Sequence, residues 1–154
     1  MKKQSLTISM IATPLMIACG LVASGVPASA QSDSAGACSN RTLSGNYGFA
    51  IEGVILAGAV TFPLRGVAMT HFDGRGNLTQ VDHVLVNGAP PASEWTSGSG
   101  PYTVNPDCTG TAQINIPGNP LSPLSLHFVV VRQGREIHTV VEANAVSSVG
   151  IKVE

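Results

Sequence analysis

The stretch LSLHFVVVRQGREIHTVVE, residues Leu124–Glu142, decides the fold class of this chain. Two runs rich in β-branched residues flank Gln133 and Gly134, and a short turn containing glycine between two such runs is typical of a β-hairpin. Because side chains alternate between the two faces of a strand, centring the turn on these two residues fixes which residues face each other. We therefore predict an antiparallel hairpin with a defined register.

The predicted register separates an apolar face of the hairpin from a mixed one. The apolar face pairs Val130 with Ile137, Phe128 with Thr139, and Leu126 with Val141. The mixed face pairs Val131 with Glu136, Val129 with His138, and His127 with Val140.

The same pattern of short β-branched runs extends through the rest of the chain. Turn signals recur about every ten residues, and no segment of comparable length shows helical periodicity. The predicted strands are Leu43–Gly53, Val60–Phe72, Leu78–Val86, Glu94–Val104, Thr111–Ile116, Leu124–Arg132, Arg135–Glu142 and Val146–Val153. Short links favour an up-and-down barrel of about eight strands, which leaves no sheet edge exposed. A two-sheet β-sandwich is the alternative architecture.

The composition excludes several classes of protein. The chain has 154 residues, of which 11% are charged and 44% hydrophobic. Charged residues are far below the roughly 25% of an ordinary soluble domain, which argues against a coiled coil or a charged disordered chain. Eight Lys and Arg against nine Asp and Glu give a net charge of −1, so nothing in the charge balance favours nucleic acid as a partner.

The first thirty residues resemble an export signal. Lys2 and Lys3 precede an apolar stretch, and Ala28-Ser29-Ala30 matches the small-x-small pattern of a cleavage site. We predict a signal peptide at 1–30, a disordered lead at 31–42 and a barrel domain at 43–154. The domain is then secreted or periplasmic, with no stable membrane span after the signal is removed. The alternative is a lipoprotein anchored through Cys19.

Cleavage at that site leaves two cysteines, Cys38 and Cys108. An even pair in an oxidising compartment predicts a disulfide. Such a bond would close a loop of about 70 residues and stabilise the fold by about 4 kcal/mol. A catalytic or metal-binding thiol is the weaker alternative, because the chain has no CxxC spacing.

Four motifs together resemble a known family. They are Cys38-Ser39-Asn40, the run from Leu43 to Phe49, the turn from Phe72 to Asn77, and the stretch from Tyr102 to Gly110. They are similar to motifs of small secreted bacterial proteins of uncharacterised function, whose expected fold resembles the allene oxide cyclase barrel of the calycin-like group. The resemblance implies a barrel that binds an apolar molecule. No set of residues matching a cyclase active site is present.

The candidate ligand-binding residues are Trp95, Tyr102, Arg65 and Glu94. Aromatic side chains with a few polar groups at a barrel mouth suit a flat or apolar ligand, and Trp95 follows the longest predicted loop. Ordinary packing or solvation is the alternative for each of them. His127 and His138 share a face of the hairpin, but a solvated strand surface explains them better than a metal site does.

Three functions stay open at this point. The first is binding of a small apolar ligand, or another envelope or extracellular role, without catalysis, cofactor or metal. The second is a barrel cyclase or isomerase acting on an apolar substrate. The third is a packed structural or adhesive module with no ligand. The first two functions need a cavity in the barrel, and the third needs a filled barrel. The sequence does not determine the oligomeric state.

Overall fold

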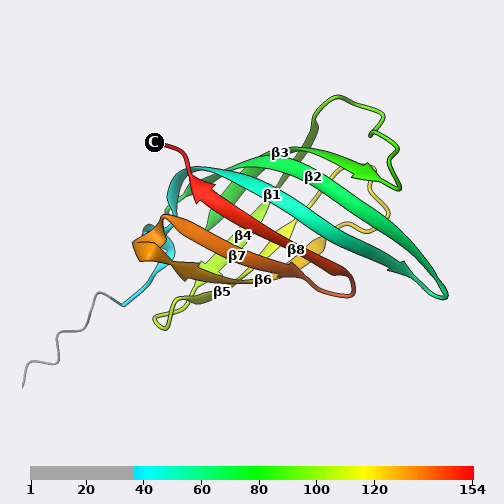
Figure 1. The fold of residues 1–154 in the computed structure, drawn as a ribbon. Coiled ribbons are helices and arrows are strands. Elements are labelled where there is room, and N and C mark those ends of the chain that lie inside the picture. The colour runs from blue at the N-terminus through cyan, green and yellow to red at the C-terminus, as the bar shows by residue number, and fades with distance from the viewer. Residues whose placement is uncertain (1–36) are drawn as a thin grey trace, which may run out of the picture. The chain divides into compact units, whose positions relative to one another are not determined.

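The computed structural model describes residues 37–154, which form a closed barrel of eight antiparallel strands (Figure 1). Each strand pairs with the next along the chain, and the last pairs with the first, so the predicted barrel is confirmed over the sandwich. The strands are β1 (Ser44–Ala57), β2 (Val60–Asp73), β3 (Asn77–Val86), β4 (Thr96–Val104), β5 (Thr109–Ile114), β6 (Leu124–Val131), β7 (Glu136–Val141) and β8 (Ala145–Lys152).

The strand ends differ from the predicted ones by a few residues. The largest difference is in β1, which runs past Gly53 to Ala57 because its pairing with β2 continues to the turn. Two three-residue 3₁₀ turns, η1 (Asn40–Thr42) and η2 (Arg132–Gly134), complete the described elements. Within this range no helix has the length and apolar character needed to cross a bilayer.

The register of the β6–β7 hairpin is the predicted one at all six pairs, from Val131 opposite Glu136 to Leu126 opposite Val141. The Arg135 N–H donates to the Arg132 carbonyl at 3.2 Å, which places Gln133 and Gly134 at the tip. Both tip residues have positive φ, the conformation that matches the twist of a tight hairpin.

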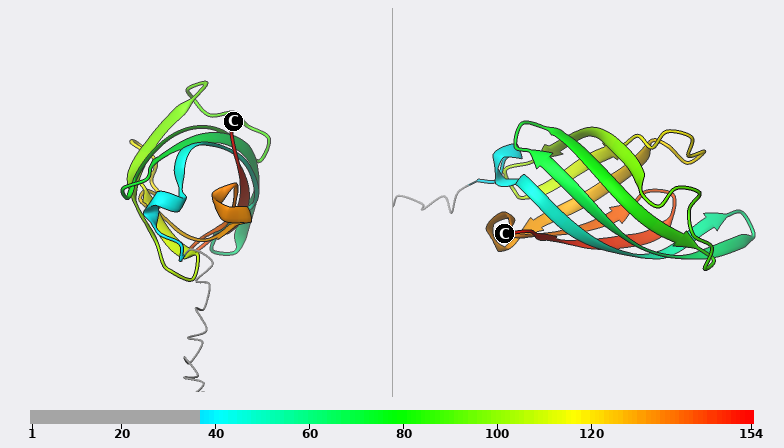
Figure 2. Two further views of the ribbon diagram at one scale, coloured as in Figure 1. Left: turned by 90° about the vertical axis from the view of Figure 1, so that its left-hand side faces the viewer. Right: turned by 90° about the horizontal axis from the view of Figure 1, so that it is seen from above.

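The two 3₁₀ turns lie at one end of the barrel, which we call the closed end (Figure 2, left). Three rings pack edge-to-face across this end: Phe72 lies between Tyr47 and Tyr102, with ring centroids 5.3 and 5.0 Å away. The buried Tyr47 hydroxyl donates to the carbonyl of Gly134 in η2. The Tyr102 hydroxyl lies 3.0 Å from the Leu43 carbonyl, so both tyrosines join the barrel wall to the segments that cover it.

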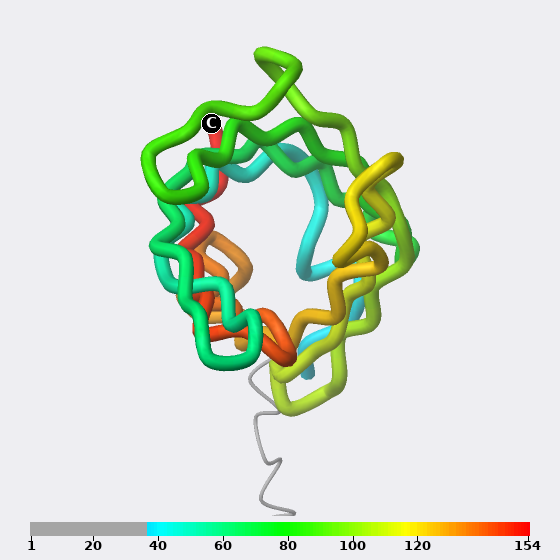
Figure 3. Tube along the Cα trace, turned by 90° about the vertical axis from the view of Figure 1, so that its right-hand side faces the viewer, coloured from blue at the N-terminus to red at the C-terminus, as the bar shows by residue number. Residues whose placement is uncertain are grey.

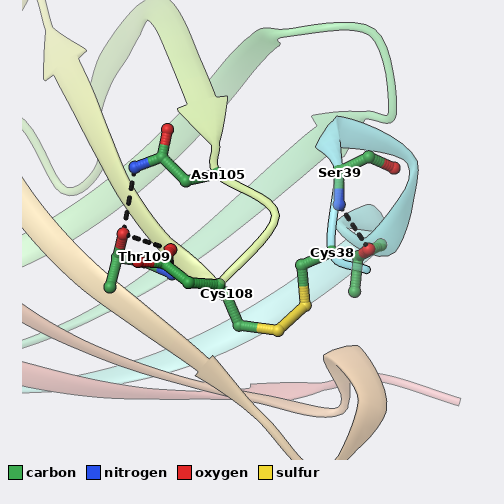
Figure 4. The surroundings of a disulfide bond; sticks show 7 residues. Cys38, Ser39, Asn105, Cys108 and Thr109 are labelled. Carbon is green, nitrogen blue, oxygen red and sulfur yellow. Dashed lines mark hydrogen bonds between the residues drawn. A yellow bond between two sulfur atoms is a disulfide. The ribbon is translucent and has the colours of Figure 1, made fainter. Parts of the chain in front are cut away.

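The predicted disulfide between Cys38 and Cys108 is confirmed, with the two Cα atoms 5.0 Å apart (Figure 4). It holds the chain before β1 against the β4–β5 turn, where the Asn40 side chain also accepts the Val104 N–H at 2.7 Å. Residues 38–42 of the predicted disordered lead therefore belong to the closed end, and residues 31–36 of that lead are outside the described residues. The predicted signal peptide 1–30 and Cys19 lie outside the described residues.

Candidate ligand-binding cavity

A cavity of about 410 Å³ occupies the inside of the barrel. Its lining extends from Phe72 near the closed end to Pro91, Leu121 and Asn144, which belong to the connections at the other end of the barrel. We call this the open end (Figure 3). The β1–β2 and β7–β8 turns and the longer β3–β4 and β5–β6 connections surround it.

Small side chains at inward positions explain why the barrel is not filled. Eight strands enclose a space that ordinary side chains can just fill. Here the inward positions include Ala68, Thr70, Ala112, Thr139 and Ser148, all of which line the cavity. Their short side chains leave unoccupied volume in the middle of the barrel.

Most of the lining is aliphatic or aromatic. The apolar lining residues come from all strands except β4 and from the open-end connections: Phe49, Ile51, Ile55, Leu64, Ala68, Phe72, Leu78, Val84, Val86, Ala89, Pro90, Pro91, Ala112, Ile114, Ile116, Leu121, Leu124, Leu126, Phe128, Ile137, Val141 and Val146. Eight polar residues complete it: Thr70, Gln80, Asp82, Thr96, Asn119, Thr139, Asn144 and Ser148. A mainly apolar wall with a few polar groups is typical of a small-molecule site.

The polar side chains inside the barrel form two groups. On β2 and β3, the Gln80 side-chain N–H donates to Asp82 Oδ2 at 2.9 Å, and the Gln80 oxygen lies 3.4 Å from the Thr70 hydroxyl. On β7 and β8, the hydroxyls of Thr139 and Ser148 are 2.7 Å apart. Since Thr70 is on β2 and Ser148 is on β8, with β1 between these two strands, the two groups lie on separate parts of the barrel wall.

Asp82 is the one charged side chain among the lining residues, all of which fall in the described part of the chain. The residue is 7% exposed, and burial raises the pKa of its carboxyl above the ordinary value of 3.8. The hydrogen bond from Gln80 and the charge of the neighbouring His83 act in the opposite direction on this pKa, with smaller effects. The cavity therefore contains a single acid in mainly apolar surroundings.

The four residues predicted to bind a ligand do not line this cavity. Trp95 is 49% exposed, with its ring edge-to-face to His83 at a centroid distance of 6.1 Å. Arg65 is on the outer wall, 3.6 Å from a carboxylate oxygen of Glu52. Glu94 is exposed in the connection before β4, next to Trp95.

Tyr102 is the fourth predicted residue, and it is buried in the closed end. The structure therefore brings Trp95 and Glu94 together but separates them from Tyr102 by the length of β4. A binding role for these four residues stays a prediction.

Sequence reasoning missed Asp82, although a signal for it exists. Asp82 shares its strand face with Leu78, Val84 and Val86, so it is an acid on a face with three apolar neighbours. The opposite face of the same strand carries Val81 and is just as consistent with a core. The pattern alone therefore did not show which face of β3 points inward.

The two histidines of the hairpin point outward and pair locally. His127 Nε2 lies 2.5 Å from Glu142 Oε1, and His138 Nε2 lies 2.6 Å from Glu136 Oε1. Both imidazoles are about half exposed. In the region that the structure covers, no three His, Cys, Asp or Glu side chains come together in a way that could hold a metal ion.

No protein-family model, curated protein or solved structure matches this chain. The resemblance to allene oxide cyclase-like barrels therefore stays a prediction. The cavity and the side chains that line it are the basis for any functional proposal.

Proposed function

We propose that this protein binds a small, mainly apolar molecule inside its barrel. The observation that carries the proposal is the cavity, whose volume lies within the range of about 300–1,000 Å³ that is common for small-molecule sites. An apolar cavity of about 150 Å³ is already large enough for benzene, so this one has room for a considerably larger molecule. A closed end at one side and loops at the other favour entry of the ligand from the open end.

The other two functions have different support. A packed structural module needs a filled barrel, which a cavity of about 410 Å³ argues against. A cyclase or isomerase acting on an apolar substrate has one observation in its favour, the buried acid Asp82 inside the cavity. Proton transfer by such a group is a common element of catalysis, but a substrate-positioning set around Asp82 is needed as well.

We also propose that the protein acts outside the cytoplasm. The support is the Cys38–Cys108 disulfide together with the resemblance of the first thirty residues to an export signal. Intact mass of the protein purified without reductant from its export compartment tests this directly. Processing after Ala30 is expected, whereas a lipid on Cys19 would indicate the lipoprotein alternative.

The binding proposal is tested with diphenylhexatriene, a neutral apolar probe that becomes fluorescent when it leaves water. The full chain, expressed with its N-terminal segment and with the disulfide intact, is titrated with the probe. We expect saturable binding of one probe per chain. Val146→Phe, which adds a ring to an inward position of β8 that lines the cavity, is expected to abolish saturable binding.

Val149→Phe is the matched control, because it makes the same change on the outward face of the same strand. It is expected to bind the probe as the unmodified protein does. Equal binding by the Val146→Phe variant would place the probe on the outer wall and would contradict the proposal. The proposal would also be contradicted if neither diphenylhexatriene nor the smaller ligands phenylbutylamine, phenylbutanol and phenylbutyrate bound saturably to the unmodified protein.

A further inference from the structure

The charge inside the cavity is unbalanced. Asp82 is the one charged side chain in the lining, and its nearest neighbours on the adjacent strands are Ala68 on β2 and Thr96 on β4, which do not titrate. His83, the next residue along β3, points to the outer face, where its Nδ1 lies 2.6 Å from the Glu94 carbonyl oxygen. No cation of the described chain therefore faces the Asp82 carboxylate from inside the barrel.

The two oxygens of Asp82 have different surroundings. Oδ2 accepts the hydrogen bond from Gln80, and the Gln80 amide is in turn oriented by Thr70 on the neighbouring strand. Oδ1 has no hydrogen-bond partner among residues 37–154. Every fully enclosed side-chain polar atom in this range does have a partner, so Oδ1 is not fully enclosed. Oδ1 is therefore accessible from the cavity, with a free acceptor position in a residue that is 93% buried.

We propose that the natural ligand is an amine with an apolar body, bound as a monocation whose ammonium N–H donates to Asp82. This inference rests on the proposed ligand-binding function and specifies the chemistry of the ligand. A buried carboxylate without a counter-charge is costly, and an ammonium ion supplies both the charge and the hydrogen-bond donor. An anionic ligand would meet repulsion at the same place.

The other cavity residues fit the body of such a ligand. Ile114, Leu124, Leu126 and Phe128 come from β5 and β6 and offer apolar surface without charge. The hydroxyls of Thr139 and Ser148 already interact with each other. The lining therefore provides one strong polar anchor and a mainly apolar remainder, which suits a molecule with one charged end.

Burial also raises the pKa of Asp82, so the empty cavity disfavours the carboxylate form. An ammonium ion stabilises that form, and an amine therefore binds best above the pKa of Asp82. Acidification protonates the carboxyl and removes the ion pair. A neutral ligand of the same shape lacks this dependence.

The test uses three ligands with the same phenylalkyl body: phenylbutylamine, phenylbutanol and phenylbutyrate. Their affinities for the full, disulfide-bonded chain are measured by calorimetry at neutral pH. We expect the amine to bind about tenfold or more tightly than the alcohol, the difference typical of a hydrogen bond with a charged partner, and the acid to bind most weakly. On acidification, the preference for the amine over the alcohol is expected to fall.

Asp82→Asn keeps the shape of the side chain and removes its charge. This variant is expected to lose about tenfold or more in affinity for the amine and to retain its affinity for the alcohol. Glu52→Gln is the matched control, because it removes one negative charge from the outer wall of β1, where the Glu52 side chain is 67% exposed. It is expected to leave both affinities unchanged.

The outcomes separate the inference from the function on which it rests. Equal affinities for amine and alcohol, or tighter binding of the acid, would overturn the amine inference and leave cavity binding intact. Binding of none of the three ligands, together with no binding of diphenylhexatriene, would refute both. Binding of the alcohol by Asp82→Asn shows that this variant is folded. If the variant does not fold, the amine inference is tested by the unmodified protein, whose preference for the amine over the alcohol has to fall on acidification.

Discussion

Glycines opposite two phenylalanines of the cavity allow a sharp test of the packing. Gly110 on β5 lies opposite Phe128, and a Cβ added there would lie 2.3 Å from two atoms of that ring and 2.5 Å from the Thr103 carbonyl oxygen. Gly150 on β8 lies opposite Phe49, and its added Cβ would lie 2.4 to 2.8 Å from three ring atoms. Gly48 has no atom within 4 Å of the same position.

These distances predict how much each of the three alanine substitutions lowers the free energy of unfolding. Ordinary contact with a Cβ begins at 3.4 Å, so Phe128 or Phe49 would have to move by about 1 Å. In Gly150→Ala, the Phe49 ring can shift into the cavity. In Gly110→Ala, the new Cβ also meets the Thr103 carbonyl oxygen, which cannot move without its strand. Overpacking typically costs about 1–3 kcal/mol, so we expect about 3 for Gly110→Ala and about 1 for Gly150→Ala.

Gly48→Ala is the control and is expected to change the free energy of unfolding by about 0.5 kcal/mol or less. Urea unfolding of the disulfide-bonded chain, followed by far-UV circular dichroism, measures all three variants. With a urea dependence of about 1.5 kcal/mol/M, the Gly110→Ala midpoint is expected to fall by about 2 M. Equal stability of Gly110→Ala and Gly48→Ala would refute the packing of Phe128 against Gly110.

Two further predictions concern the closed end and its turns. Replacing both Cys38 and Cys108 with alanine is expected to lower the free energy of unfolding by about 4 kcal/mol, because the bond spans 70 residues of sequence. Urea unfolding measures this free energy, and an unchanged value in the variant would contradict the prediction. Asp73 accepts hydrogen bonds from the N–H groups of Arg75, Gly76 and Asn77, and the bonds to Asn77 contribute most to lowering its pKa to about 2. The stabilising contribution of Asp73 is therefore complete above pH 3.8 and lost as the pH falls toward 2. The urea midpoints of the unmodified protein and of Asp73→Asn, measured at several pH values, should therefore converge in that window. A difference between the two midpoints that stays constant with pH would contradict this role of Asp73.

Local signals were sufficient for the strands and their order. The turn at Gln133 and Gly134 fixes the β6–β7 register, because a hairpin with a tight turn allows one pairing of its two strands. The disulfide followed from counting cysteines after the predicted cleavage site. Short connections indicated a barrel, since each strand has to pair with its neighbour along the chain.

The candidate site was predicted less well, for a geometric reason. Alternation shows that a strand has two faces, but both faces of these strands carry Val and Thr, so it does not show which one points inward. Trp95 and Arg65 suggested a binding site from their residue types, yet both are on the outer surface. Asp82 is on the inner surface, next to Gln80 on the same face of β3.

The sequence by itself determined the number of strands, their antiparallel order, the tight turns and the pairing of Cys38 with Cys108. These features depend on residues close together in the chain or on the two cysteines that remain after the predicted cleavage site. Only the tertiary structure decided that small inward residues leave a cavity and that Asp82 faces it. Both facts depend on how eight strands close around a common interior, which no single segment encodes.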